Sequence, residues 1–140
     1  MPETQDLEIY TDGASRGNPG HAAYAFIFVR DGRAVLERSG YIGIATNNTA
    51  EYRAIIAALA EAAKDTDGPV RVYSDSELVI RQITGAYRVN KEHLRDLKDE
   101  VLRLAGRFSS VTFASVRRTE PWIGRADELC NRELDSRRGR

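Results

Sequence analysis

A nearly uninterrupted apolar run, Ala22–Arg30, is the feature of this sequence that most limits its possible folds. A run of this length and composition is typical of a strand that is buried on both faces of a sheet. The Asp31-Gly32 dipeptide that follows is a strong signal for a two-residue hairpin turn. We therefore expect Arg33–Ile42 to pair antiparallel with the apolar run.

The segments around this hairpin predict further strands and helices. Leu7–Thr11 alternates like a strand that stops at Asp12-Gly13, and the turn-rich residues 14–20 predict a loop. Apolar periodicity predicts two more strands, at residues 70–74 and 111–116, and helices at residues 48–65, 76–84, 91–105 and around 126–134. A hairpin followed by strand–helix–strand connections indicates an α/β fold, with a mixed sheet and helices packed on it.

Length and composition favour a single globular domain over residues 1–140, in which the basic residues 137–140 form a flexible tail. The chain has 21 Lys and Arg against 21 Asp and Glu, so its net charge does not indicate a polyanionic partner. Its one cysteine, Cys130, excludes an internal disulfide and a zinc site built from cysteines. The sequence shows no signal peptide and no apolar stretch long enough to span a membrane, so we expect a cytoplasmic monomer without an obligate protein partner.

Four acidic residues fall where the predicted topology would bring them together. Asp12 and Asp75 each follow an apolar strand, and neighbouring parallel strands lie about 4.8 Å apart. Glu51 and Asp127 are each expected in the first turn of a helix. Carboxylates gathered at one edge would repel one another, and a divalent cation would relieve that repulsion. Ligands that are all oxygen favour Mg²⁺ or Mn²⁺ over Zn²⁺.

Each of these acids also has an ordinary structural interpretation. Glu51 could complete a capping box with Asn48, and Asp127 could stabilise the start of a helix through the helix dipole. Asp75 could cap the helix that follows it, and Asp12 could be a turn residue. These interpretations do not explain why all four acids fall where the topology predicts a site.

Four segments of the chain resemble the motifs of type 1 ribonuclease H, in the order and spacing of that family. The segments are Tyr10–Gly20, Thr46–Tyr52, Tyr73–Ser76 and Ala126–Asn131. The resemblance covers essentially the whole chain and implies a ribonuclease H-like fold, a five-stranded mixed β-sheet flanked by α-helices. It also implies an endoribonuclease that hydrolyses the RNA strand of RNA–DNA hybrids, leaving 3′-hydroxyl and 5′-phosphate ends, with little sequence specificity.

The resemblance assigns roles to individual residues. It makes Asp12, Glu51, Asp75 and Asp127 both the catalytic residues and the ligands of two Mg²⁺ ions, which Mn²⁺ could replace. One ion would activate the attacking water and the other would stabilise the leaving 3′-oxygen, as in two-metal catalysis. The residues expected to contact the hybrid, including its 2′-hydroxyl groups and its phosphates, are Gly13, Ala14, Asn18, Thr46, Asn47, Asn48, Arg117 and Arg118.

Two departures from the family pattern concern residues that would contact the substrate. Many members carry a histidine in the loop before the last aspartate, but residues 117–124 contain none, which leaves Arg117, Arg118 or Glu120 as candidates for its place. Some members also have a basic protrusion, whereas the matching residues 85–93 hold only two Lys or Arg side chains. We therefore interpret the chain as a compact form that lacks the protrusion.

Two other functions fit parts of the sequence. Asp12-Gly13 after a strand resembles phosphatases of the haloacid dehalogenase type, but Tyr10 stands where their nucleophilic aspartate is required. A ribonuclease H fold that binds nucleic acid without cutting it would be indicated by the loss of a carboxylate, and all four are present. Integrase-like and junction-resolving nucleases share the fold, and the match to all four motifs disfavours them.

Overall fold

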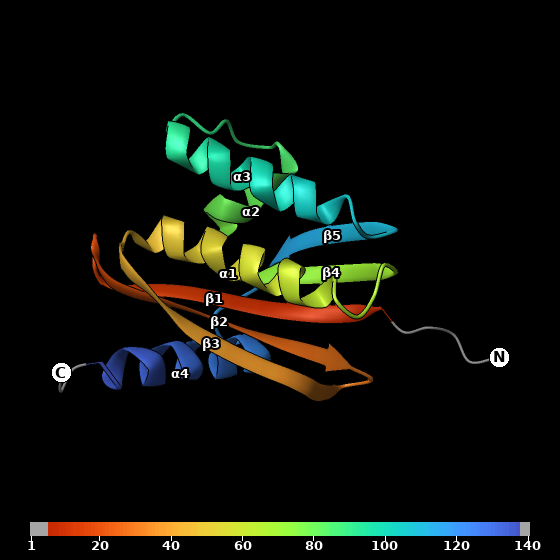
Figure 1. Ribbon diagram of the computed structural model, residues 1–140, viewed down its shortest axis with the longest axis horizontal. Helices are drawn as coiled ribbons and strands as arrows, with labels where there is room; N and C mark the ends of the chain where they lie inside the picture. Colours follow the sequence, from red (N-terminus) through yellow and green to blue (C-terminus); the bar gives the residue numbers. More distant parts are fainter. Residues whose placement is uncertain (1–5, 138–140) are drawn as a thin grey trace.

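The computed structural model describes residues 6–137, in which a five-stranded mixed sheet has helices on both faces (Figure 1). The strand order is β3-β2-β1-β4-β5, with β1–β2 and β2–β3 antiparallel and β1–β4 and β4–β5 parallel. This confirms the predicted fold class. The elements are β1 (Leu7–Gly17), β2 (Gly20–Arg30), β3 (Arg33–Ala45), α1 (Asn47–Ala62), β4 (Pro69–Ser74), α2 (Glu77–Thr84), α3 (Glu92–Ala105), β5 (Ser110–Ser115) and α4 (Pro121–Asp135).

The hairpin predicted from the apolar run is present as β2 and β3. Asp31 and Gly32 both have positive φ, as a two-residue turn between right-twisted strands requires. Residues 26–29 of β2 are at most 4% exposed, because helices cover both faces of the strand. Phe26 and Phe28 belong to one core, and Ile27 and Val29 belong to the other.

Two hydrophobic cores lie on opposite faces of the sheet. Figure 1 shows α1, α2 and α3 on one face and α4 alone on the other. The larger core packs β-strand side chains such as Ile9 against Leu59 of α1 and Leu104 of α3. The smaller core packs Tyr10 against Ile123 of α4 and its neighbours. The two faces of β1 are therefore held by different helices, which fixes the strand between them.

Strand β1 is longer than the sequence indicates. The turn-forming residues 14–20 predict a loop, but β1 continues to Gly17 and pairs with β2 as far as Gly20. Only Asn18 and Pro19 form the turn, and their peptide bond is cis. The prediction that Asp12 ends the strand is therefore wrong. Asp12 lies in the middle of β1, beyond the point where its parallel neighbour β4 ends at Ser74.

The caps of α1 and α2 decide two of the alternatives for the acidic residues. Thr46 caps α1 and accepts a hydrogen bond from the Thr49 backbone N–H at 3.2 Å, so the capping box of Asn48 and Glu51 is wrong. Ser76, not Asp75, caps α2 and accepts from the Val79 backbone N–H at 3.2 Å. Neither acid is used to cap a helix.

Helix α4 starts earlier than its apolar periodicity suggests. It begins at Pro121, and the Glu120 side chain accepts hydrogen bonds from the backbone N–H groups of Trp122 and Ile123. Asp127 therefore lies in the second turn, and the prediction that it occupies the first turn is wrong. The helix-dipole explanation for Asp127 loses its basis, because that effect is confined to the first turn.

The remaining boundaries agree with the sequence to within about three residues. Residues 85–91 join α2 directly to α3, as predicted for the compact form. Within residues 6–137, none of the helices combines the length and the apolar character needed to cross a membrane. Arg137 lies over the Tyr41 ring, with its guanidinium carbon 4.3 Å from the ring centroid, while residues 138–140 of the predicted tail lie outside the described residues.

At Gly13, β1 and α1 approach each other closely. A Cβ atom at this position would overlap the carbonyl group of Ala50 and lie 2.5 Å from the backbone nitrogen of Glu51. Because both neighbours are backbone atoms, they cannot move aside without displacing the start of α1. The close approach therefore requires glycine.

We predict that Gly13→Ala lowers the free energy of unfolding by about 1–3 kcal/mol, as overpacking of a filled interior does. Gly124→Ala is the matched control, since a Cβ there meets nothing within 4 Å and lies within α4. That change should raise stability by up to about 1 kcal/mol, because alanine favours a helix over glycine. Urea unfolding of both variants tests this, and equal stability of the two would contradict the packing argument.

Candidate active site

Asp12 and Asp75 are brought together by the register of β1 and β4. Tyr10 pairs with Tyr73 in this parallel ladder, and continuing the same register places Asp12 beside Asp75. The ladder between β1 and β4 ends with the pair of Tyr10 and Tyr73, so Asp12 and Asp75 lie just beyond the last paired residues. The prediction that parallel pairing brings these carboxylates close together is confirmed.

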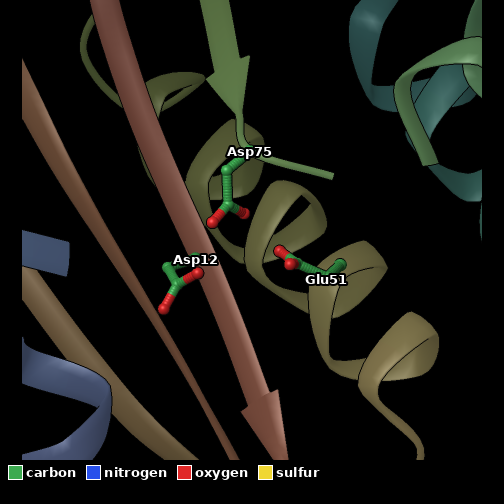
Figure 2. Close-up of side chains that lie close together, drawn as sticks. All are labelled: Asp12, Glu51 and Asp75. Carbon is green, nitrogen blue, oxygen red and sulfur yellow. The ribbon is translucent and has the colours of Figure 1, made fainter. Parts of the chain in front are cut away.

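Glu51 reaches the same point from α1. Its Oε1 accepts a hydrogen bond from the Gly13 backbone N–H at 3.0 Å, which ties the helix to β1. Glu51 is the fifth residue of α1 and lies in the second turn, so the prediction that it occupies the first turn is wrong. One carboxylate oxygen from each of Asp12, Glu51 and Asp75 lies within 4.8 Å of the other two. Figure 2 shows these three side chains converging from β1, α1 and the end of β4.

This arrangement is electrostatically unfavourable for the protein alone. Asp12 is only 5% exposed, and its burial, together with the charges of Asp75 and Asp127, raises its pKa to about 8. Burial and the charges of Asp12 and Asp75 also raise the pKa of Glu51 well above its usual value. Both shifts have the same cause, which is negative charge removed from water without an opposite charge beside it.

The donor set fits a hard divalent cation. Asp12 Oδ2 is buried and has no hydrogen-bond partner among the described residues, which is unusual for a buried carboxylate oxygen. The three side chains offer oxygen ligands only, as hard divalent cations prefer. A cation here would satisfy the unpartnered oxygen and neutralise the mutual repulsion.

Asp127 lies near this group but is not part of it. It lines the same cavity as the three other acids and is exposed on α4. Its charge contributes to the raised pKa of Asp12. Its Oδ2 accepts a hydrogen bond from Asn131 Nδ2 at 3.4 Å. The structure thus brings all four predicted acids to one cavity, three of them closely.

The cavity has a volume of about 520 Å³ and opens to solvent. Five of the eight residues predicted to contact substrate line it, namely Gly13, Ala14, Asn47, Asn48 and Arg118. Asn18, Thr46 and Arg117 do not line it. Thr46 is the cap of α1, and Asn18 Oδ1 accepts from the Asn47 backbone N–H at 3.1 Å. These two residues hold the start of α1 in place.

The candidates for the missing loop histidine differ in position. Arg118 is the basic residue among those lining the cavity, and its Nε lies 4.0 Å from Asp75 Oδ2 with 92% of its side chain exposed. Glu120 is occupied in capping α4. The geometry thus favours Arg118 over Glu120 for a contact with substrate.

Sequence reasoning missed the contact of Ser15 with Asn47 and the places of Ser76, Ile123 and Gly124 in the cavity wall. Asn47 Oδ1 accepts hydrogen bonds from the backbone N–H and the Oγ of Ser15, at 2.9 and 3.1 Å. Ser76 could have been found from the sequence, because it directly follows Asp75 at the start of the helix predicted at residues 76–84. Ser15 gave no signal, because its contact depends on the unforeseen extension of β1.

Comparison with known proteins decides the family. A family model described as RNase H matches residues 4–112. The chain belongs to the ribonuclease H family. Ribonuclease H of Chlorobium luteolum is 34% identical to it over an alignment of 146 positions, which covers 94% of this chain and 97% of that protein.

Other ribonuclease H relatives agree in sequence and in structure. Ribonuclease HI of Halobacterium salinarum is 43% identical over 130 residues, and the crystal structure of RNase H1 from that archaeon superimposes with a TM-score of 0.88, at 41% identity, over 94% of this chain and 98% of that chain. LC11-RNase H1, crystallised in complex with an RNA/DNA hybrid, superimposes with a TM-score of 0.87 at 36% identity, over 94% of this chain and 98% of that chain.

The chain spans only part of the length of several of its relatives. The match to Halobacterium ribonuclease HI covers 92% of this chain and 64% of that protein. The bifunctional protein Rv2228c of Mycobacterium tuberculosis is 39% identical, and the match covers 91% of this chain and 35% of that protein.

We predict that, without divalent cations, this ribonuclease H chain loses stability as pH rises from about 4 to about 8. The raised pKa means that folded Asp12 keeps a proton which the unfolded chain releases above about pH 4, so raising the pH favours unfolding. One such group gives a slope of about 1.4 kcal/mol per pH unit inside the window.

Asp12→Asn removes this titration and should flatten the dependence, leaving the variant more stable than the parent at pH 8. Urea unfolding in a chelator at several pH values measures the effect. If the free energy of unfolding depended on pH with the same slope in parent and variant, Asp12 would not be the cause of the loss of stability.

Proposed function

We propose that this chain is an endoribonuclease that hydrolyses the RNA strand of RNA–DNA hybrids with two Mg²⁺ ions. The observation that carries the proposal is the group of Asp12, Glu51 and Asp75 oxygens within 4.8 Å of one another in a chain of the ribonuclease H family. The structural relative crystallised with an RNA/DNA hybrid supports the choice of substrate. The chain spans only part of the length of some relatives. The proposed activity is therefore that of this chain, and not that of the longer proteins.

The four carboxylates would hold the ions, with Asp12 at the centre. When bound, two such ions supply an activated water and stabilise the charge that develops on the leaving 3′-oxygen, which gives 3′-hydroxyl and 5′-phosphate ends. Asp12 suits the central position because it lies close to both Glu51 and Asp75 and has an oxygen without a hydrogen-bond partner among the described residues. Mn²⁺ accepts the same oxygen ligands and would substitute.

Selection of RNA rests on recognition of the 2′-hydroxyl groups that distinguish it from DNA. Gly13, Ala14 and Asn47 line the cavity beside Glu51 and are our candidates for this recognition. The two hydrogen bonds that Asn47 Oδ1 accepts from Ser15 orient the amide, leaving its nitrogen as the donor for substrate. The same contacts hold the β1–β2 hairpin against α1.

Contacts with the phosphates would position the hybrid without reading its sequence. Asn48 and Arg118 line the cavity and would make such contacts directly. We propose Asn18, Thr46 and Arg117 for the outer part of this surface. Arg118 is exposed and lies at the cavity mouth, where a guanidinium can bind a phosphate but cannot act as a general base.

Asp12→Asn and Asp75→Asn should each reduce cleavage by more than about 100-fold, since each removes a proposed metal ligand while leaving the shape of the site intact. Asp31→Asn, in the β2–β3 turn, makes the same change of charge away from the site and should leave cleavage unchanged. The assay follows a labelled RNA–DNA hybrid with Mg²⁺, with and without a chelator.

The same assay separates the proposal from a binding module. If the parent chain binds the hybrid but does not cut it when Mg²⁺ or Mn²⁺ is supplied, the fold serves binding only. Near-normal turnover by either variant would remove that residue from the proposed machinery.

We also predict that hybrid binding depends less on salt than it does in a relative with the basic protrusion. The residues that join α2 to α3 offer few cations, and each lost phosphate contact lowers the slope of log affinity against log salt by about 0.9. Binding of the Asp12→Asn variant at several salt concentrations measures the slope without cleavage. A slope as steep as that of a protrusion-bearing relative would contradict the prediction.

A further inference from the structure

A chain of polar contacts connects the tip of the β1–β2 hairpin to Asp127. Arg16, near the end of β1, donates from Nη2 to the side-chain Oδ1 of Asn131 at 3.3 Å and to its backbone oxygen at 3.4 Å. Asp135 Oδ1 lies 2.8 Å from the same Nη2. Asn131 Nδ2 in turn donates to the backbone oxygen and to Oδ2 of Asp127, at 3.1 and 3.4 Å.

Arg16 determines which way the Asn131 amide points. An amide has one acceptor end and one donor end, and a guanidinium can only donate. Oδ1 of Asn131 must therefore face Arg16, and Nδ2 must face Asp127. If Arg16 were absent, the amide oxygen would lose the donor that holds it, and Nδ2 would be free to leave the Asp127 carboxylate for solvent.

Asp127 needs such support more than Asp12 and Glu51 do. Asp12 is buried and Glu51 is held by the Gly13 backbone, whereas Asp127 is exposed on α4 and outside the close group. An exposed carboxylate samples several rotamers, and fixing one of them before a ligand arrives lowers the entropy lost on binding. Asn131 lies four residues after Asp127, one turn along the same face of the helix.

We propose that Arg16 and Asn131 are positioning residues that hold the Asp127 carboxylate toward the cavity for a divalent cation. The proposal rests on the proposed function of the site. Asp135 holds Arg16 in place, and Arg16 holds the amide of Asn131. Asn131 in turn fixes the rotamer of Asp127, whose Oδ1 is left to bind the cation. Neither Arg16 nor Asn131 lines the cavity, so both act through Asp127.

The direction in which Arg16→Gln changes the affinity for a cation distinguishes positioning from simple electrostatics. Arg16→Gln removes a positive charge near an acidic site, and charge alone would make cation binding tighter. Loss of positioning makes it weaker. We expect Arg16→Gln and Asn131→Ala each to weaken Mn²⁺ binding by about 10-fold, in the range seen when residues that orient a metal ligand are lost.

The experiment titrates the full chain with MnCl₂ and follows free Mn²⁺ by electron paramagnetic resonance, without nucleic acid. Arg132→Gln is the matched control. It also removes one positive charge, but Arg132 lies on α4 and contacts Glu128 instead of Asn131. It should leave Mn²⁺ affinity unchanged or slightly higher. In an Asp127→Asn background, Arg16→Gln and Asn131→Ala should cause no further loss, because their effect passes through Asp127.

Urea unfolding in a chelator accompanies each titration, and the midpoints should match the parent, because exposed ion pairs contribute little to stability. Affinity that stays the same or rises in Arg16→Gln and Asn131→Ala, while the parent binds Mn²⁺ and cuts the hybrid, overturns the positioning proposal alone. A parent chain that neither binds Mn²⁺ nor cuts the hybrid overturns the proposed function and this inference with it.

Discussion

The repulsion among Asp12, Glu51 and Asp75 is the constraint on which the rest of the structure depends. Three carboxylates whose oxygens lie within 4.8 Å, one of them almost fully buried, would separate if their supports were flexible. Each support belongs to a different element, and two hydrophobic cores clamp β1 between α1 and α4. The packing energy of both cores therefore opposes the repulsion, and the site gains a fixed shape at some cost in stability.

Backbone contacts transmit this clamping to the acids themselves. Gly13 lets α1 approach β1 so closely that its own N–H reaches Glu51, and any side chain there would separate the two elements. On the other side of the same junction, Asn18 bonds to the first residue of α1, and Asn47 bonds back to Ser15. The extended hairpin is therefore a brace for the start of α1, and not a free loop beside the site.

These observations explain which features the sequence could predict. The order of strands and helices along the chain, the antiparallel hairpin and the meeting of Asp12 with Asp75 followed from apolar periodicity, turn signals and the geometry of parallel strands. The extension of β1 was hidden, because Gly, Ser, Asn and Pro have the same composition in a loop and at the tip of a long hairpin. The partner of Glu51 was equally hidden, since Gly13 lies 38 residues away and its role is a contact between backbone and side chain.

The charge of the cavity would make the binding of a cation and the binding of a nucleic-acid phosphate depend on each other. Four acids and one basic residue, Arg118, line it, so a nucleic-acid phosphate would be repelled by the protein alone. A divalent cation held between the carboxylates and a phosphate is attracted by both, and linkage requires that each ligand raise the affinity for the other. Arg118 is too exposed to offset the negative charge of the acids, because solvent screens its attraction. The acids would therefore disfavour binding of a nucleic-acid phosphate until a cation accompanies it, and this follows from where β4 ends and α1 begins.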